Sequence, residues 1–463
     1  MLLRPEVASK VLDHALSLGA DFAELFVEKN RNSNISILSS RVHEVAGGID
    51  FGIGIRLIYG TKVLYGYTNS IDEEELKRMT TLIATHDAQE SHYTPIALHK
   101  HTILDQHHAT LGLNSTYATD EKIKFLLTID QSARSISEQI NQVSANSLQR
   151  LQSIEIFNTE GLHTADNRHY TRVSTRVFAQ DGTEQSTGYE APGALQGWEF
   201  THGLDPQQLG QRVAKQALIK LQAIECPAGK MPVIIDNGFG GVIFHEACGH
   251  LLETTSVAKK ASVFWDQMGQ MIANECVSAV DDGTITGEWG SINIDDEGMA
   301  TQKTQLIKNG QLTSFLVDKV GAMKTGYART GSGRRQNYKF APTSRMRNTF
   351  IEPGDSSLEE MIASIPHGVY CKKMGGGSVQ PGTGEFNFAA QESYLIKDGK
   401  IDQALKSATL IGTGPSILKQ ISMVSTNFEL AAGMCGSVSG AIPTTVGQAA
   451  IKVDEILVGG QGQ

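Results

Sequence analysis

The chain has 463 residues, of which 40% are hydrophobic and 19% are charged. At roughly 150 residues per domain this length predicts two or three domains, each able to bury its own core. General disorder and a small disulfide-stapled fold are therefore excluded. The 40 Lys and Arg residues against 50 Asp and Glu residues give a net charge of −10. Such a surface repels phosphate backbones, so we expect no nucleic-acid partner.

Neither a membrane location nor secretion is expected. No stretch approaches the roughly 18 unbroken apolar residues that a membrane-spanning helix needs. The first residues include Lys10, Asp13 and His14, where a secretory signal would carry an apolar run. The five cysteines are odd in number and form no CxxC pair, which argues against a disulfide framework. We expect a cytoplasmic protein.

Residues 1–225 are expected to form an α/β domain, a curved sheet with flanking helices. Alternating apolar residues predict strands in DFAELFVE, NISILSS and the segment FGIGIRLIYGTKVLYGY, which turns at a glycine. Apolar residues at helical spacing predict the helices, and the region between the second and third helices lacks a period, so a loop is expected there. The helices are predicted at 5–18, 72–88, 120–141 and 205–224, and the loop at 89–119.

Residues 226–463 are expected to form a second, mainly β domain. The stretch CPAG at 226–229 predicts a boundary, and the apolar run PVIID after it predicts a buried strand. Beyond residue 280 the turn signals DDGT, KNGQ and KDGK separate short strand-like runs, which favours hairpins. The whole chain is therefore predicted to be an α+β protein.

The segment NGFGGVIFHEACGHLLETT carries the residues with the clearest chemistry. Its apolar spacing predicts one helix that holds His245, Glu246 and His250. The histidines are five residues apart, about 140° around a regular helix, which is too far for one shared ion. A π-bulge would bring them together, and Gly249 would ease that distortion. The expected helix is thus a metal-binding one with a distortion near residue 249.

Zinc suits such a set, because two neutral imidazoles and a third protein ligand leave one coordination position open for water. Glu246 would then act as general base and later hand the proton to a leaving amine, which is the chemistry of peptide hydrolysis. A bare HExxxH pattern also arises by chance. Cys248 is either a further ligand near His245 or a small buried residue, and spacing does not decide between these roles.

The second half of the chain resembles the TldD/PmbA metalloproteases, and more specifically their motif-bearing TldD-type subunit. The resemblance covers residues 226 to the end and rests on several segments. Besides the HExxxH segment these are DDGTITGEWGSINIDDEG, TGSGRRQNY, SRMRNTFIEPG, GGGSVQPGTGEFNF, ATLIGTGPSILKQISMV and GMCGS. The resemblance implies a zinc peptidase with His245, His250 and Cys435 as metal ligands and Glu246 as general base.

The resemblance also implies the substrate and the assembly. Members of the family act on small or unfolded peptides, with the metal enclosed in a dimer. This chain carries the motif, so the resemblance implies a homodimer or a heterodimer with a sister subunit that lacks it. An extended peptide added to a sheet edge would be bound through its main chain, so we expect weak sequence specificity.

Several other groups outside the motif admit a functional and a structural interpretation. Arg334, Arg335 and Arg345, with Arg347, either hold a peptide carboxylate or reach a partner, or they lie in a solvated basic loop. The acidic runs at 281–282 and 295–297 are expected to form turns, because they lack the ligand spacing of a calcium loop.

Two rival functions remain open. The first is an HExxGH-type dipeptidyl peptidase, in which Glu275 of the stretch ANECVSAV would complete the metal site. The second is a non-catalytic modulator that binds a protein such as a topoisomerase subunit, with a metal that is only structural. Glu246 argues against the second, because a structural site does not require a general base.

Overall fold

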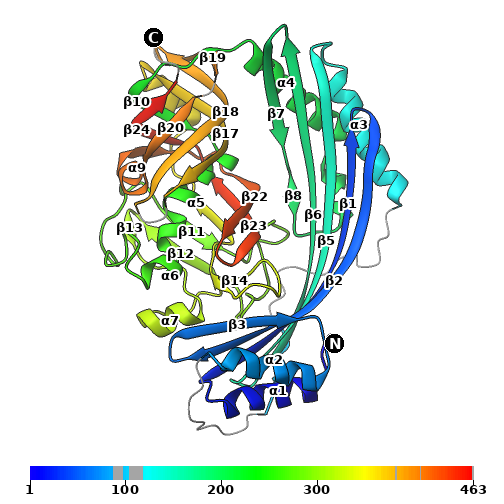
Figure 1. The fold of residues 1–463 in the computed structure, drawn as a ribbon. Helices are drawn as coiled ribbons and strands as arrows, with labels where there is room; N and C mark the ends of the chain where they lie inside the picture. The colour runs from blue at the N-terminus through cyan, green and yellow to red at the C-terminus, as the bar shows by residue number, and fades with distance from the viewer. Residues whose placement is uncertain (87–96, 104–117, 381–382, 407, 461–463) are drawn as a thin grey trace.

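A computed structural model describes residues 1–86, 97–103, 118–380, 383–406 and 408–460 (Figure 1). The first part of the chain builds an eight-stranded sheet in the order β3-β2-β1-β5-β6-β4, and β7 and β8 also pair with β6. Four of its strands have 17 to 20 residues each. The strands are β1 (Phe22–Leu38), β2 (Arg41–Tyr59), β3 (Lys62–Thr68), β4 (His99–Lys100), β5 (Ile140–Asn158), β6 (Leu162–Asp181), β7 (Glu184–Glu190) and β8 (Gly193–Ala194).

Helices flank this curved sheet at both of its ends, as expected (Figure 1). The helices α1 (Pro5–Ser17) and α2 (Glu73–Ala84) share a core with β1 and β2, while α3 (Thr119–Arg134) and α4 (Pro206–Leu221) share another with β5 and β6. The predicted helix 120–141 is too long. Ile136 still packs against the core, but Ile140 already begins β5, because the chain reverses between them. The loop expected at 89–119 falls largely outside the described residues.

The second part of the chain is mainly β, which confirms the predicted fold class. One sheet has the order β17-β10-β24-β20-β18-β19-β9, with β21 on β24, and β17 also pairs with β18, so the sheet closes on itself. Its strands are β9 (Ile224–Glu225), β10 (Gly229–Ile235), β17 (His367–Val379), β18 (Glu385–Lys397), β19 (Lys400–Lys406), β20 (Thr409–Thr413), β21 (Ile421–Val424) and β24 (Ile451–Gly459). The predicted domain boundary at residue 226 stays a prediction.

A second sheet of this part has the order β13-β12-β11-β16-β23-β22, which leaves β22 at its edge, and β14 pairs with β15 alone. Its hairpin turn at Asn309 and Gly310 has positive φ at both residues, as the KNGQ signal predicts. The strands are β11 (Ala279–Asp282), β12 (Lys303–Lys308), β13 (Gln311–Leu312), β14 (Gly333–Arg334), β15 (Thr343–Ser344), β16 (Asn348–Ile351), β22 (Glu429–Ser437) and β23 (Gly440–Gln448).

Short helices complete this part, and α5 (Val242–Ala247) has the central place. It packs against β17 and β18 of one sheet and against β16 and β23 of the other. None of the helices in the described ranges is both long and apolar enough to cross a membrane. The remaining short helices are η1 (Trp198–Gly203), η2 (Gly238–Gly241), η3 (Gly249–Leu252), α6 (Thr254–Val257), α7 (Lys319–Thr325), α8 (Leu358–Ala363) and α9 (Gly414–Gln420).

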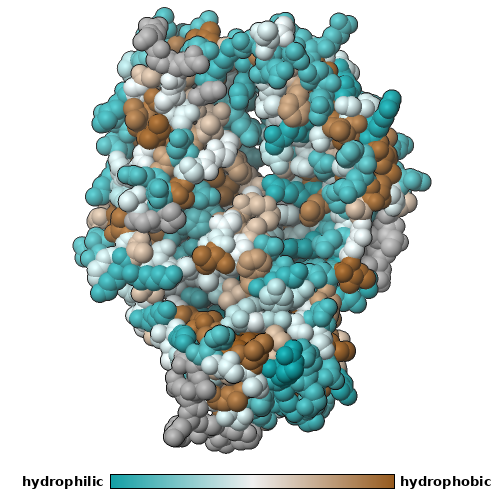
Figure 2. All heavy atoms as spheres, in the orientation of Figure 1, coloured by the Kyte–Doolittle hydropathy of each residue, from teal (hydrophilic) through white to brown (hydrophobic). Residues whose placement is uncertain are grey.

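Buried ion pairs join the first sheet to the rest of the molecule. Arg56 donates to Glu24 at 2.7 Å and to Glu297 at 2.6 Å, and all three side chains are almost fully buried. Arg168 of β6 likewise donates to Asp296 at 2.7 Å. Figure 2 shows a hollow between the long strands of the first sheet and the second part of the chain, with hydrophobic residues in small groups among hydrophilic ones. These ion pairs fix the first sheet against the part that carries the HExxxH segment.

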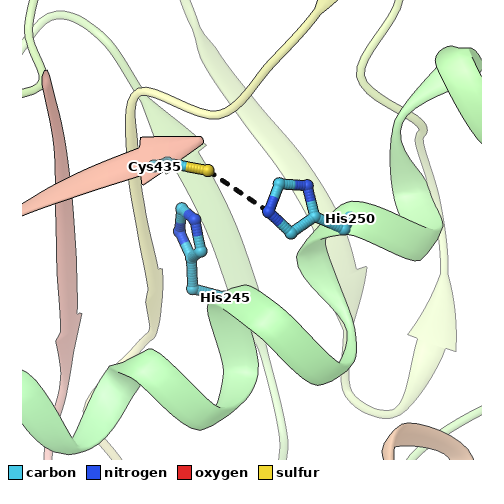
Figure 3. Close-up of side chains that lie close together, drawn as sticks. All are labelled: His245, His250 and Cys435. Atoms are coloured by element: carbon cyan, nitrogen blue, oxygen red, sulfur yellow. Dashed lines mark hydrogen bonds between the residues drawn. The ribbon is translucent and has the colours of Figure 1, made fainter. Parts of the chain in front are cut away.

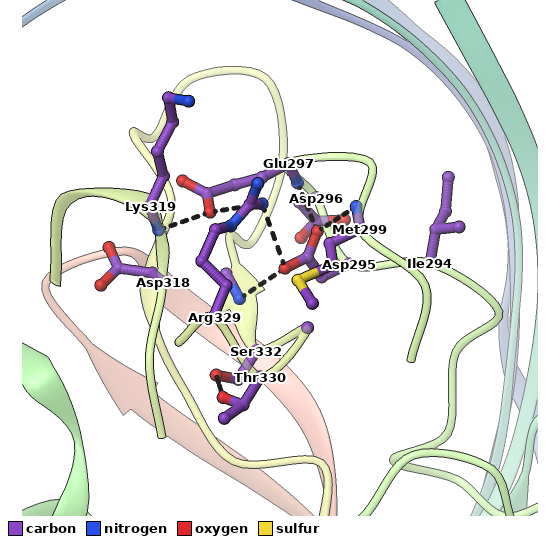
Figure 4. Close-up of polar contacts among 12 residues, drawn as sticks. Ile294, Asp295, Asp296, Glu297, Met299, Asp318, Lys319, Arg329, Thr330 and Ser332 are labelled. Carbon is purple, nitrogen blue, oxygen red and sulfur yellow. Dashed lines mark hydrogen bonds and ion pairs between the residues drawn. The ribbon is translucent and has the colours of Figure 1, made fainter. Parts of the chain in front are cut away.

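The two acidic runs are more than turns. Asp295 accepts from the backbone N–H groups of Glu297 and Met299, as a turn requires (Figure 4). The run is nevertheless buried. Asp281 lies in β11 and pairs with Arg347 at 2.7 Å. Asp282, the last residue of that strand, accepts from the Thr284 backbone N–H at 2.9 Å, so the expected turn is confirmed from Asp282 onward. A buried carboxylate needs a cationic partner such as Arg347. The sequence pattern Asp-Asp-Gly indicates a turn but does not show that its carboxylates are buried.

Asp318, beside this acidic group, gives a pH-dependent prediction. Burial and the neighbouring Glu297 carboxylate raise the pKa of Asp318 to about 6, although hydrogen bonds from Thr254 and Gly321 oppose this. Between pH 4 and 6 the folded protein thus holds a proton that the unfolded chain releases, so this group makes stability fall as the pH rises. Asn at position 318 keeps the helix cap and removes the titration.

We expect the Asp318→Asn variant to gain stability relative to the wild type as the pH rises through this window, by on the order of 3 kcal/mol. Urea unfolding of both proteins at pH 4, 5, 6 and 7 measures the difference. If the difference in unfolding free energy between the two proteins is the same at all four pH values, the raised pKa of Asp318 is contradicted.

Candidate metal centre

A glycine-rich turn starts the HExxxH segment directly after β10. Gly238 has φ +61, which lets the chain reverse into η2 and then into α5. At Gly241 an added Cβ would lie 2.4 Å from the Gly447 carbonyl oxygen of β23. The start of α5 therefore approaches the sheet backbone more closely than any larger residue permits, and His245 is carried close to the neighbouring strand β22.

The helix does not continue through the motif. It ends at Ala247, Cys248 has φ −125 and ψ −48, and the chain goes on as the 3₁₀ turn η3. The distortion expected near residue 249 is confirmed, but its expected form, a π-bulge, is wrong. Gly249 packs against Met346, whose Sδ would lie 2.2 Å from an added Cβ. Close packing at Gly249 thus accompanies a break in the helix, and not the extra residue in one turn that defines a π-bulge.

The break turns His250 towards His245. The two ring centroids lie 5.2 Å apart at an angle of 85°. Cys435 of β22 approaches from the other side, and its Sγ lies 3.2 Å from His250 Nε2 (Figure 3). One ligand atom from each of the three residues lies within 4.8 Å of the others. The structure therefore gathers the three residues that the family resemblance implies as metal ligands.

The cluster is largely shielded from water. His245 and Cys435 are buried, and the His250 side chain is 12% exposed. Burial alone would raise the pKa of Cys435, but the two imidazoles outweigh it and lower the pKa to about 3. Burial opposes the charged form of His250, yet the Glu253 carboxylate and Cys435 raise its pKa well above the usual value. The cysteine is thus a thiolate, which is the form that binds metals.

Glu253 contacts His250 on the side of the ring that faces away from Cys435, and the sequence analysis did not identify it. Its Oε2 lies 3.0 Å from His250 Nδ1, and the side chain is 3% exposed. A carboxylate in this position fixes the ring orientation, so that Nδ1 faces Glu253 and Nε2 faces Cys435 Sγ. The available signal was its position three residues after His250, since residues at that spacing share a helix face.

Glu246 lies beside the cluster and not inside it. Its Oε2 is 3.5 Å from His250 Nε2, and its side chain is 26% exposed. It is therefore the partly open carboxylate of the motif, whereas Glu253 is the buried one. This difference in exposure suits Glu246 to exchange protons with a molecule that enters the site.

Two rival residues lie outside the cluster. Glu275 is exposed and does not join the His245, His250 and Cys435 set among the described residues. Cys248 is buried in the main core, with Sγ 3.9 Å from the Gly414 carbonyl oxygen. Burial raises the pKa of Cys248, so it stays a neutral thiol. The geometry thus favours Cys435 over both rivals as the third ligand.

The three arginines are interior residues. Arg334, Arg335 and Arg345 are 2%, 3% and 0% exposed. Arg334 donates to the Met346 carbonyl oxygen, Arg335 pairs with Glu24, and Arg345 donates to the Cys435 carbonyl oxygen. The expectation that they hold a substrate carboxylate is wrong for this conformation, because the interior encloses all three guanidiniums. The sequence does not show that this basic segment is buried.

The donor set fits a zinc ion. Two imidazoles and one thiolate are ligands that zinc prefers, and three protein ligands leave a position for water or substrate. His245 Nδ1 is buried and has no hydrogen-bond partner within the described chain. A buried polar atom without a partner is costly unless something else binds in the same place. This observation is independent of any similarity to other proteins.

Three family models, all described as PmbA/TldA metallopeptidase, match the chain. Domain 1 matches residues 23–80, the central domain matches 114–221, and the C-terminal domain matches 228–460. The HExxxH segment and Cys435 both lie within the C-terminal match.

Curated relatives and solved structures extend the comparison. The metalloprotease TldD homolog of Haemophilus influenzae is 33% identical over 449 residues, 95% of this chain and 93% of that protein. A zinc metalloprotease TldD homolog of Saccharolobus solfataricus is 27% identical over 452 residues, 97% of this chain and 99% of that protein.

Two crystal structures share the fold with a TM-score of 0.77. One is TldE from Thermococcus kodakarensis, at 18% identity, covering 98% of this chain and 100% of that one. The other, a candidate modulator of a DNA gyrase from Thermotoga maritima, has 20% identity and covers 98% of this chain and 99% of that one. At these identities both likenesses show the fold alone.

Proposed function

The chain belongs to the TldD/PmbA family of metallopeptidases, and we propose that it hydrolyses small or unfolded peptides with a zinc ion held by His245, His250 and Cys435. The observation that carries the proposal is the convergence of two imidazoles and a remote thiolate within 4.8 Å. The name of the Saccharolobus relative as a zinc metalloprotease supports the choice of zinc.

In this proposal Glu246 moves the proton. Bound zinc would polarise the substrate carbonyl group and make water acidic enough to lose a proton near neutral pH. Glu246, 3.5 Å from His250 through its Oε2 and partly open, accepts that proton and passes it to the leaving amine. Glu253 holds the His250 ring from the opposite side and takes no part in the transfer.

The substrate class follows from the family and from the sheets. An unfolded peptide can add to a sheet edge through its main chain, which recognises few side chains. We propose weak sequence specificity for this reason. One of the edge strands of the described sheets, β22, carries Cys435.

The assembly and the compartment are part of the same proposal. We propose a homodimer or a heterodimer with a sister subunit that lacks the motif, and the shared fold with TldE supports the second form. All five cysteines are free, which fits the reducing cytoplasm.

Metal removal tests the proposal directly. The purified protein is treated with a chelator, then divided and supplied with zinc, magnesium or buffer before digestion of an unfolded peptide. We expect zinc to restore cleavage and magnesium to fail, since magnesium prefers oxygen ligands. Full cleavage by the metal-free protein would refute the proposal.

The buried Glu253 gives a separate prediction for the same site. We expect Glu253→Gln to weaken zinc binding by about 10- to 100-fold, because residues behind a metal-bound histidine have effects of this size. Competition with a chromogenic chelator measures the dissociation constant. Glu275→Gln is the control, and it should bind zinc as the wild type does. A loss of zinc in the Glu275 variant, with none in the Glu253 variant, would instead support the dipeptidyl-peptidase alternative.

A further inference from the structure

Cys435 lies near the exposed end of an edge hairpin, a poor place for a metal ligand unless something holds it. The hairpin consists of β22 and β23, joined by a turn at residues 438–439, and in the described sheet β22 pairs with β23 alone. Met434 and Val438, on either side of Cys435, are 50% and 72% exposed. Strand ends of this kind open locally at low cost. The position of the sulfur therefore depends on contacts from outside the hairpin.

The upstream part of β22 has such contacts. Trp289 Nε1 donates to the Gly433 carbonyl oxygen at 2.7 Å, and Arg172 donates to that of Ala432 at 3.2 Å. Both contacts end before the cysteine. Gln336 holds the turn, through its backbone N–H to Ser439 and its side chain to Ala441, and it leaves Cys435 untouched.

Arg345 contacts the part of the hairpin between Cys435 and Gly440. Its Nη2 donates to the Cys435 carbonyl oxygen at 2.6 Å. Its Nη1 donates to Ser439 Oγ and to the Gly440 carbonyl oxygen, both at 2.9 Å. One guanidinium thus ties the metal-ligand residue itself to the turn of its hairpin. The planar fork of arginine can reach both at once, which a lysine ammonium cannot do.

The chemistry of these contacts is unusual for a buried arginine. Arg345 is 0% exposed, and within the described chain its partners are neutral oxygens. Arg347, equally buried and two residues later, pairs with the Asp281 carboxylate. Burying a cation without a counter-charge is costly, so stabilising the fold alone does not explain the choice of arginine at position 345.

We propose that Arg345 is a positioning residue, which holds the Cys435 main chain so that Sγ meets the two imidazoles. This inference rests on the proposed metal site. It assigns the arginine a role in metal affinity, in place of the substrate contact that the sequence suggested.

Two variants and a matched control test the inference. Arg345→Lys keeps the charge and loses the fork, and Arg345→Met loses both. Arg347→Lys disturbs an equally buried arginine whose side-chain hydrogen bonds, within the described residues, go to Asp281, Thr301, Thr304, Thr330 and Gly331, all outside the hairpin. Each protein is measured for its zinc dissociation constant and its melting temperature without metal. The cobalt-substituted forms are measured for the sulfur-to-cobalt absorption band.

We expect both Arg345 variants to bind zinc about 10- to 100-fold more weakly, with a weakened cobalt band, while Arg347→Lys keeps wild-type zinc affinity despite a lower melting temperature. If Arg345→Met does not fold, Arg345→Lys alone carries the comparison. Wild-type affinity in Arg345→Lys, or an equal loss in Arg347→Lys, would overturn the inference. A wild type whose zinc binding does not depend on His245 and His250 would instead overturn the proposed function.

Discussion

Replacing Glu246 with glutamine is expected to lower kcat for peptide hydrolysis by about 10²- to 10⁴-fold, the usual contribution of a general base. Glutamine has nearly the same shape as glutamate but does not accept a proton. The carboxylate lies outside the cluster of metal ligands, so zinc content is expected to stay at the wild-type level. Digestion of an unfolded peptide and metal analysis of the same samples measure the two effects.

The combination of results is what identifies the role. Lost activity with retained zinc assigns Glu246 to proton transfer. If zinc is lost as well, Glu246 is itself a metal ligand, and its Oε2, 3.5 Å from His250 Nε2, belongs to the cluster. Unchanged cleavage would contradict the mechanism altogether and would favour a structural metal.

Removing the thiolate is expected to have an equally large effect on the metal itself. Zinc binding to a structural site of four ligands is worth about 10–16 kcal/mol, or about 3 kcal/mol for each ligand. We therefore expect Cys435→Ala to weaken zinc binding by about 10²-fold or more. Activity should fall with zinc occupancy and partly recover when zinc is in excess.

Cys248→Ala is the matched control, because this cysteine lies in the motif, is buried and remains outside the cluster. It should lose some stability through the cavity it leaves and keep wild-type zinc affinity. If Cys248→Ala loses zinc and Cys435→Ala does not, the assignment of the third ligand is reversed.

Much of the fold could be predicted from local patterns. The helices α1 and α4 lie within three residues of their predicted bounds and α2 within four, since each has a regular apolar face. The turn signals KNGQ and KDGK form hairpins, because Asn-Gly and Asp-Gly tolerate positive φ. Predictions of this kind depend only on residues that are close together in the sequence.

The site could be predicted only in part, because its decisive contacts join distant segments. The spacing of His245 and His250 indicated a distorted helix, but packing of Gly249 against Met346 accompanies a break. Cys435 came from resemblance alone, since local spacing does not relate it to the histidines. The burial of Arg345 depends on the whole second half of the chain, so its contact with Cys435 was beyond any local pattern.

X-ray absorption at the zinc edge of the purified protein tests the central claim most directly. The three-residue site predicts one sulfur at about 2.3 Å and two imidazole nitrogens at about 2.0–2.1 Å, with the remaining position filled by a light atom. The sulfur contribution should vanish in Cys435→Ala reconstituted with excess zinc. A wild-type spectrum without sulfur, or one with more than one sulfur, would contradict a centre made of His245, His250 and Cys435.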